Sequence, residues 1–192
     1  FSAAACNMAC AYCYMPKTPV MRRLHARVVD ELRSGQWVNS LKQVVGHRLE
    51  HLGFWGTEPT LVLDCLVPQV PSLLEAFPNL KTIGFSTNLL QRPEVICDFA
   101  RALSAVTDKV KFDLQVSLDG PAWVTDVNRH AGATPAILEN LKFLFEALGS
   151  GGLGIVAGMR FKPTLTIQNM RDMDDRRIEE WFSFFDGILD MY

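Results

Sequence analysis

Segments with the two-residue periodicity of strands alternate with longer helical segments along this chain of 192 residues. The pattern predicts strands over 46–56, 81–88, 110–118 and 155–166, and residues 1–5 have the character of a strand end. It predicts helices over 20–35, 72–76, 93–106, 133–148 and 175–189. Such alternation indicates βαβ units and a parallel sheet. About five units are too few for a closed barrel, and right-handed crossovers would wind them into a curved, partly open barrel.

The predicted strands carry polar side chains on one of their two faces. In the segment 110–118, Phe112 and Leu114 share one face, while Asp113 and Gln115 share the other. Parallel strands covered on both faces are normally apolar throughout. We therefore expect the polar faces to line a hollow that holds a polar ligand or water, because each unpaired buried group costs about 1 to 3 kcal/mol. The alternative is an ordinary amphipathic sheet with one solvated face.

Distinctive segments follow the predicted strands at their carboxyl ends. They are the cysteine-rich loop at 6–13, then 56–59, 86–88 and 117–120. Because ligands bind at the carboxyl ends of parallel strands, we expect all four segments to meet at one rim.

Three cysteines lie within eight residues, at Cys6, Cys10 and Cys13. A structural zinc site closes with four protein ligands, whereas three thiolates on a four-iron cluster leave one iron open to another ligand. A zinc or other metal-binding knot stays open as an alternative. Cys65 and Cys97 stand in apolar or helical surroundings, and we predict that both are buried free thiols.

The spacing Cys-x-x-x-Cys-x-aromatic-Cys, with Tyr12 before the last cysteine, resembles the signature of the radical S-adenosylmethionine enzymes. This resemblance implies that Cys6, Cys10 and Cys13 bind a [4Fe-4S] cluster and that its open iron chelates S-adenosylmethionine. It implies reductive cleavage of this cofactor to a 5'-deoxyadenosyl radical, with Tyr12 packed beside the adenine. It also implies an α/β fold of the partial (β/α)6 type, an open barrel with parallel strands.

Gly56, Thr57, Glu58 and Pro59 resemble the Gly-Gly-Glu-Pro segment that contacts the amino group of the cofactor in that family. The resemblance assigns Gly56 and Glu58 to the cofactor. Thr57 replaces the second glycine, which leaves the backbone conformation there open.

Ser117 and Asp119, in a Ser-x-Asp-Gly-Pro segment, resemble residues near the cofactor ribose in the peptide- and protein-modifying branch of the family. This branch includes the anaerobic sulfatase-maturating enzymes and the SPASM-type peptide maturases. Arg129 matches an arginine of that branch and is expected to pair with the methionyl carboxylate.

Ser86 and Asn88 are similar to the Thr-Asn-Gly segment that ends the third strand in the same branch. We expect both side chains near the cofactor. Leu89 stands where the branch has glycine.

Composition excludes some partners. The net charge is −2 and charges of both signs are interspersed, so there is no basic field for nucleic acid or an anionic membrane. No apolar run is long enough to span a bilayer. Clustered thiols favour a reducing cytoplasm.

The resemblance implies an oxidoreductase whose radical abstracts hydrogen from a peptide or protein substrate, with a flavodoxin or ferredoxin as reductase. A small-molecule substrate and a non-catalytic metal-binding module are the alternatives. We expect residues 1–192 to be one radical S-adenosylmethionine core domain, truncated at both ends and without an auxiliary-cluster domain.

Overall fold

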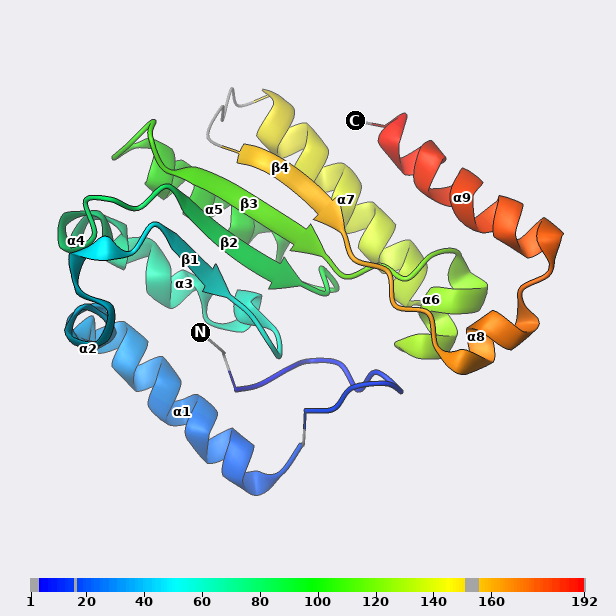
Figure 1. Cartoon of the computed structure of the whole chain (residues 1–192), viewed down its shortest axis with the longest axis horizontal. Coiled ribbons are helices and arrows are strands. Elements are labelled where there is room, and N and C mark those ends of the chain that lie inside the picture. The colour runs from blue at the N-terminus through cyan, green and yellow to red at the C-terminus, as the bar shows by residue number, and fades with distance from the viewer. Residues whose placement is uncertain (1–3, 16, 151–155, 192) are drawn as a thin grey trace.

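The computed structural model describes residues 4–15, 17–150 and 156–191. In this part of the chain four strands form one sheet in the order β1-β2-β3-β4. They are β1 (His51–Phe54), β2 (Thr82–Thr87), β3 (Lys111–Val116) and β4 (Val156–Phe161). All neighbouring strands are parallel, which confirms the predicted α/β class (Figure 1).

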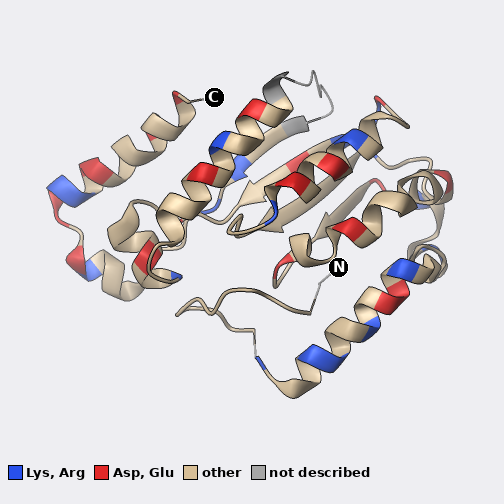
Figure 2. Cartoon of the chain, turned by 180° about the vertical axis from the view of Figure 1, so that it is seen from behind, with Lys and Arg blue, Asp and Glu red and all other residues tan. Residues whose placement is uncertain are grey.

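Helices connect the strands and cover one face of the sheet. The helices are α1 (Pro19–Ser34), α2 (Gln36–Val45), α3 (Leu63–Leu66), α4 (Val70–Ala76), α5 (Pro93–Ser104), α6 (Ala122–Asn128), α7 (Ala133–Ser150), α8 (Ile167–Asp172) and α9 (Asp175–Leu189). Short 3-10 turns are η1 (Gly46–Arg48), η2 (Pro59–Leu61) and η3 (Val67–Gln69). Seen from behind, α3, α5 and α7 lie over the sheet, and the N-terminal loop runs below the sheet (Figures 1 and 2).

Local signals explain where α1 begins and ends. Pro19 occupies its first turn, and the Thr18 hydroxyl accepts a hydrogen bond from the Met21 amide at 3.3 Å. At the other end Gly35 adopts a left-handed conformation, with φ 73°, and its N–H bonds to Leu32 O. The prediction of a helix over 20–35 is therefore confirmed.

Three predicted strands differ clearly from the structure. The strand predicted over 155–166 corresponds to β4, which ends at Phe161. The segment 46–56 contains the turn η1 before β1, so the strand is shorter than predicted. Of the predicted strand end at 1–5, residues 1–3 lie outside the described part, and Ala4 and Ala5 are not in a strand. Ala5 O nevertheless accepts a hydrogen bond from the Glu58 amide at 2.9 Å, so the chain there runs beside the segment after β1.

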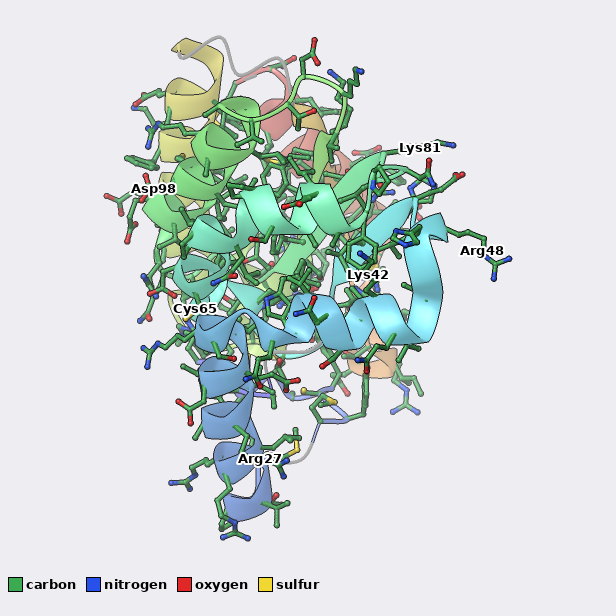
Figure 3. The ribbon with its side chains drawn as sticks, turned by 90° about the vertical axis from the view of Figure 1, so that its left-hand side faces the viewer. Arg27, Lys42, Arg48, Cys65, Lys81 and Asp98 are labelled. Carbon is green, nitrogen blue, oxygen red and sulfur yellow. The ribbon has the colours of Figure 1, made fainter. Side chains whose placement is uncertain are left out.

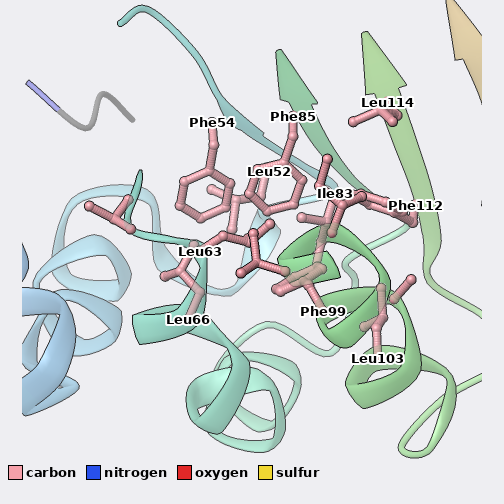
Figure 4. Packing of buried hydrophobic residues seen from close by; sticks show 14 of the residues in the cluster. Leu52, Phe54, Leu63, Leu66, Ile83, Phe85, Phe99, Leu103, Phe112 and Leu114 are labelled. Atoms are coloured by element: carbon pink, nitrogen blue, oxygen red, sulfur yellow. The ribbon is translucent and has the colours of Figure 1, made fainter. Parts of the chain in front are cut away.

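Aromatic side chains fill the space between the sheet and its covering helices (Figure 4). Phe54 and Phe85, on adjacent strands, stack with ring centroids 4.8 Å apart. Phe85 contacts Phe99 of α5 edge to face, at 5.0 Å. Phe54, Phe85, Phe99 and Phe112 are almost fully buried, and burial of each such ring stabilises the fold by about 1.5 to 3 kcal/mol.

The last helix, α9, packs at the β4 side of the molecule through further aromatic contacts. The ring centroid of Phe185 lies 5.7 Å from that of Phe161 of β4 and 4.9 Å from that of Trp181.

Cys65 and Cys97 are buried free thiols, as predicted. None of the described helices is long and apolar enough to span a bilayer.

Candidate functional site

The N-terminal loop crosses the carboxyl ends of the strands (Figure 1). Main-chain hydrogen bonds fix it at two places: Ala5 O accepts from Glu58 N, and Ala11 N donates to Asn128 O at 2.8 Å. The loop thus joins the end of β1 to the end of α6. This places its cysteines near the carboxyl ends of the strands.

Cys6, Cys10 and Cys13 are all free and line one cavity of about 590 Å³. Cys6 and Cys10 are half-buried, whereas Cys13 is exposed. The predicted cofactor residues that also line the cavity are Tyr12, Gly56, Ser86, Asn88, Ser117 and Arg129. The structure therefore brings four separate segments to one rim, as the sequence predicts.

Polar groups of the protein surround two of the sulfurs. The Met8 amide lies 3.4 Å from Cys6 Sγ, and Asn88 Nδ2 lies 3.8 Å from it. Arg129 Nη1 lies 3.9 Å from Cys10 Sγ. Burial raises the pKa of both thiols, and the charge of Arg129 opposes this rise at Cys10.

The three thiols are close enough to influence one another electrostatically. Even so, no three Cys, His, Asp or Glu side chains in the described ranges are arranged to hold a single metal ion. The cysteines of a four-iron cluster each bind a different iron, so their sulfurs lie farther apart than the ligands of one ion.

The Glu58 side chain is not part of the cavity wall. It is fully buried, and its carboxylate accepts hydrogen bonds from Thr60 Oγ1 at 2.7 Å, Thr87 Oγ1 at 2.8 Å and the Asn88 amide at 2.7 Å. Burial raises the pKa of Glu58, while these donors act in the opposite direction. Glu58 thereby ties the loop after β1 to the end of β2, and the cavity wall contains Gly56 and Thr57 instead.

Thr57 and Leu89 stand where the family motifs described above have glycine, and both have left-handed backbone conformations. Thr57 has φ 52° and Leu89 has φ 50°. For a β-branched residue such as Thr57 this conformation is strained. The Thr57 hydroxyl donates a hydrogen bond to Gly56 O at 2.6 Å. The replacement of glycine thus leaves the glycine-type backbone in place.

Asp119 is also behind the cavity wall. Its carboxylate accepts hydrogen bonds from Arg129 Nη2 at 2.8 Å, Tyr12 Oη at 3.2 Å and the Thr164 amide at 2.9 Å. Asp119 is fully buried, and Arg129, Tyr12 and Thr164 line the cavity in front of it. Asp119 therefore positions three groups of the wall.

Arg129 is 7% exposed, and its Nε atom is buried without a hydrogen-bond partner in the described part of the chain. Its guanidinium carbon lies 5.6 Å from the centroid of the Tyr12 ring. Burial alone would lower the pKa of Arg129, but Asp119 raises it, so the guanidinium stays charged. Burial also raises the pKa of Tyr12, which stays a neutral phenol.

The cavity wall includes residues that the sequence motifs do not point to. Gln115 Nε2 donates to Ser86 Oγ at 2.9 Å across β3 and β2, and Trp55 and Thr164 also line the cavity. The common signal of these three residues is position, because each lies on the polar face of a strand or just after its carboxyl end. Further lining residues, among them Lys17 and Arg22, come from the segment before α1 and from its first turn, and no motif points to them. Arg160, which shares the polar face of β4, forms an ion pair with Asp113 and is not part of the wall.

No protein-family model and no curated protein matches the chain. Solved structures of other proteins are similar to it. The structure described as native anSMEcpe with bound AdoMet, an anaerobic sulfatase-maturating enzyme, superposes with a TM-score of 0.60 at 15% identity over 96% of this chain. A hexahistidine-tagged form of anSMEcpe with bound AdoMet gives the same TM-score at 18% identity. The chain spans 46% of the length of both. At these identities the likeness shows the fold alone, an open α/β arrangement with a parallel sheet.

Proposed function

We propose that this chain is the core of a radical S-adenosylmethionine enzyme, with Cys6, Cys10 and Cys13 as the ligands of a [4Fe-4S] cluster. The observation that carries the proposal is the convergence of three free thiols and one buried, partly unpaired arginine on the same cavity. The likeness to AdoMet-bound structures supports it.

The residues fit such a cluster in their chemistry. Thiolates are the usual ligands of iron-sulfur clusters, and N–H groups near the sulfurs stabilise their negative charge. Met8 supplies one such N–H at Cys6, and Arg129 supplies another at Cys10. Three thiolates leave one iron for the cofactor. When bound, the cluster supplies the electron that cleaves S-adenosylmethionine to a 5'-deoxyadenosyl radical.

The wall provides groups for each part of S-adenosylmethionine. Arg129 has an unpaired Nε and a charge held by Asp119, and it would bind the methionyl carboxylate. Tyr12 offers an aromatic ring for the adenine, and Ser117 offers a hydroxyl for the ribose.

The remaining predicted residues fall into two groups, those that line the cavity wall and those that lie behind it. Gly56, Ser86 and Asn88 line the wall and would contact the cofactor directly. Glu58 and Asp119 lie behind it and would position the residues that do. This differs from the direct contacts that the resemblance implies for both carboxylates.

The proposed substrate is a peptide or protein side chain from which the radical abstracts hydrogen. The polar strand faces would form the far side of the cavity and orient the substrate, and the half-buried setting of the wall would limit water. A flavodoxin or ferredoxin in a reducing cytoplasm would supply the electron. A small-molecule substrate is the second candidate.

Anaerobic reconstitution tests the proposal. The protein should bind about four irons and four sulfides and should yield 5'-deoxyadenosine from S-adenosylmethionine on reduction. Changing Cys6, Cys10 and Cys13 to Ala should abolish both properties. Cys65→Ala is the matched control, because Cys65 is a buried thiol outside the cavity wall. A colourless protein that holds one zinc ion would contradict the proposal and favour a metal-binding module.

A further inference from the structure

Every charged residue described in the cavity wall is a cation. They are Lys17, Arg22, Arg129 and Lys162, and the wall contains no Asp or Glu in the part of the chain that the structure describes. The whole chain, in contrast, has a net charge of −2, and on its helical side acidic and basic residues alternate (Figure 2). The charge of the cavity wall therefore differs in sign from that of the chain.

The proposed cofactors do not balance this charge. Arg129 is already paired with Asp119, and the carboxylate and sulfonium of S-adenosylmethionine cancel. An oxidised four-iron cluster with three thiolates carries one net negative charge. Lys17, Arg22 and Lys162 have no described carboxylate within ion-pair distance. With both cofactors bound, the cavity would still carry an excess of positive charge.

Of the three wall cations without a described carboxylate partner, Lys162 is the one with a described contact to an aromatic ring. Its Nζ lies 4.8 Å from the centroid of the Trp55 ring. Trp55 follows β1 and Lys162 follows β4, which are separated by two strands, or about 14 Å in a flat sheet. The two side chains nevertheless meet, and they line the same cavity as Ser86 of β2 and Gln115 of β3, the two strands between them.

We infer that the substrate carries a carboxylate and that Lys162, seated on the Trp55 ring, is its counterion. This inference rests on the proposed function and specifies the substrate of the same cavity. The ammonium group of Lys162 has no anionic partner in the described structure and lies on an aromatic face that leaves its other N–H donors free. The favoured source of the carboxylate is an acidic side chain of a peptide, and a free dicarboxylic acid is the other source.

The test uses the reconstituted protein, loaded with cluster and S-adenosylmethionine and immobilised without oxygen. A random hexapeptide pool is passed over it, and the composition of the retained peptides is read by mass spectrometry. The inference predicts that Asp and Glu are enriched about threefold, the size of a partly exposed charge pair. Lys162→Glu should remove this enrichment and favour Lys and Arg instead, and Lys162→Gln should abolish the preference.

Arg48→Glu is the matched charge control. Arg48 is exposed, precedes β1 at the opposite end of the strand from the cavity, and extends away from the body of the molecule (Figure 3). It should leave the peptide preference unchanged. In a second arm, free glutarate is added at the same concentration as the peptides. If glutarate prevents retention of the acidic peptides, the site is assigned to a small dicarboxylate.

Retained peptides without acidic enrichment would overturn the inference, as would an enrichment that Lys17→Glu or Arg22→Glu removes and Lys162→Glu does not. Bound iron and S-adenosylmethionine are measured on the same protein before the pool is applied. Loss of these two would count against the proposed function, whereas their presence with no acidic preference would count against the substrate inference alone.

Discussion

The indole Nε1 of Trp181 donates a hydrogen bond to the main-chain oxygen of Asp119 at 2.8 Å. This contact joins α9 to the loop after β3, 62 residues earlier in the chain. The Asp119 carboxylate holds Arg129 and Tyr12 in the cavity wall, so the same residue is fixed by α9 on one side and positions the candidate site on the other.

Trp181→Phe keeps an aromatic ring and removes this one donor. We expect a loss of about 1 kcal/mol in the free energy of unfolding, because the Asp119 oxygen loses its partner. Urea denaturation measures it. The control is Trp123→Phe: Trp123 Nε1 is buried and makes no hydrogen bond within the described part, so that change should cost less. Equal losses for the two variants would contradict the prediction.

Gly120→Ala should be more damaging than Trp181→Phe. A Cβ at Gly120 would lie 2.5 Å from two atoms of the Trp181 ring, and φ there is +141°. Strain and the clash together should cost about 2 to 4 kcal/mol in stability. Thermal unfolding checks this. Gly158→Ala is the control, because nothing described lies within 4 Å of its Cβ position, and a milder effect at Gly120 than at Gly158 would count against the geometry.

Thr57→Gly should stabilise the protein by about 1 kcal/mol, because glycine adopts the left-handed conformation without the cost that a β-branched residue carries. Thr57→Ala serves as the control: it removes the same hydroxyl but keeps a Cβ at positive φ. We expect a higher melting temperature for the glycine variant than for the alanine variant. The reverse order would show that strain at this position does not limit stability.

Asp119→Asn should destabilise the protein by about 3 kcal/mol, because it leaves the buried Arg129 guanidinium without a counter-charge. Asp113→Asn removes a carboxylate from the more exposed pair with Arg160 and should cost less than about 1 kcal/mol. Urea denaturation compares the two variants. Similar losses would mean that the charge of Asp119 contributes little.

Asp126 gives a prediction for acid pH. Burial alone would raise its pKa, but hydrogen bonds from Thr134 and from the Gly132 amide lower it below the usual value. A lowered folded pKa contributes stability above the unfolded value of about 3.9, and this contribution is lost as the pH falls through the folded pKa. Asp126→Asn should therefore be less stable than the parent protein at pH 7, by about 1 kcal/mol, and nearly equal to it at about pH 2. Stability curves against pH that stay parallel would contradict this assignment.

The parallel sheet and most of the long helices could be predicted because their periodicities extend over many residues, whereas α2 was not predicted. The helix over 175–189 agrees with α9, whereas α6 and α8 have only 7 and 6 residues and too little periodicity to predict.

The sequence predicted which residues lie at the candidate site better than it predicted what each residue does there. Motif spacing places Glu58 and Asp119 near the cofactor, but only the folded chain shows that both are fully buried behind the residues that line the cavity. The contact between Trp55 and Lys162 joins residues that follow the two outer strands, β1 and β4, and no local sequence pattern contains such a long-range pairing.

This meeting also gives the molecule an optical reporter. Trp55 is 58% exposed on the cavity wall, while Trp37 is buried, Trp123 lies under Arg177 outside that wall, and Trp181 lies against the loop after β3. A cation above an indole alters its excited state, so any molecule that draws Lys162 away from Trp55 will shift the emission of that tryptophan. Binding of a molecule in the cavity can therefore be followed through tryptophan emission, without an added label and before any product is known.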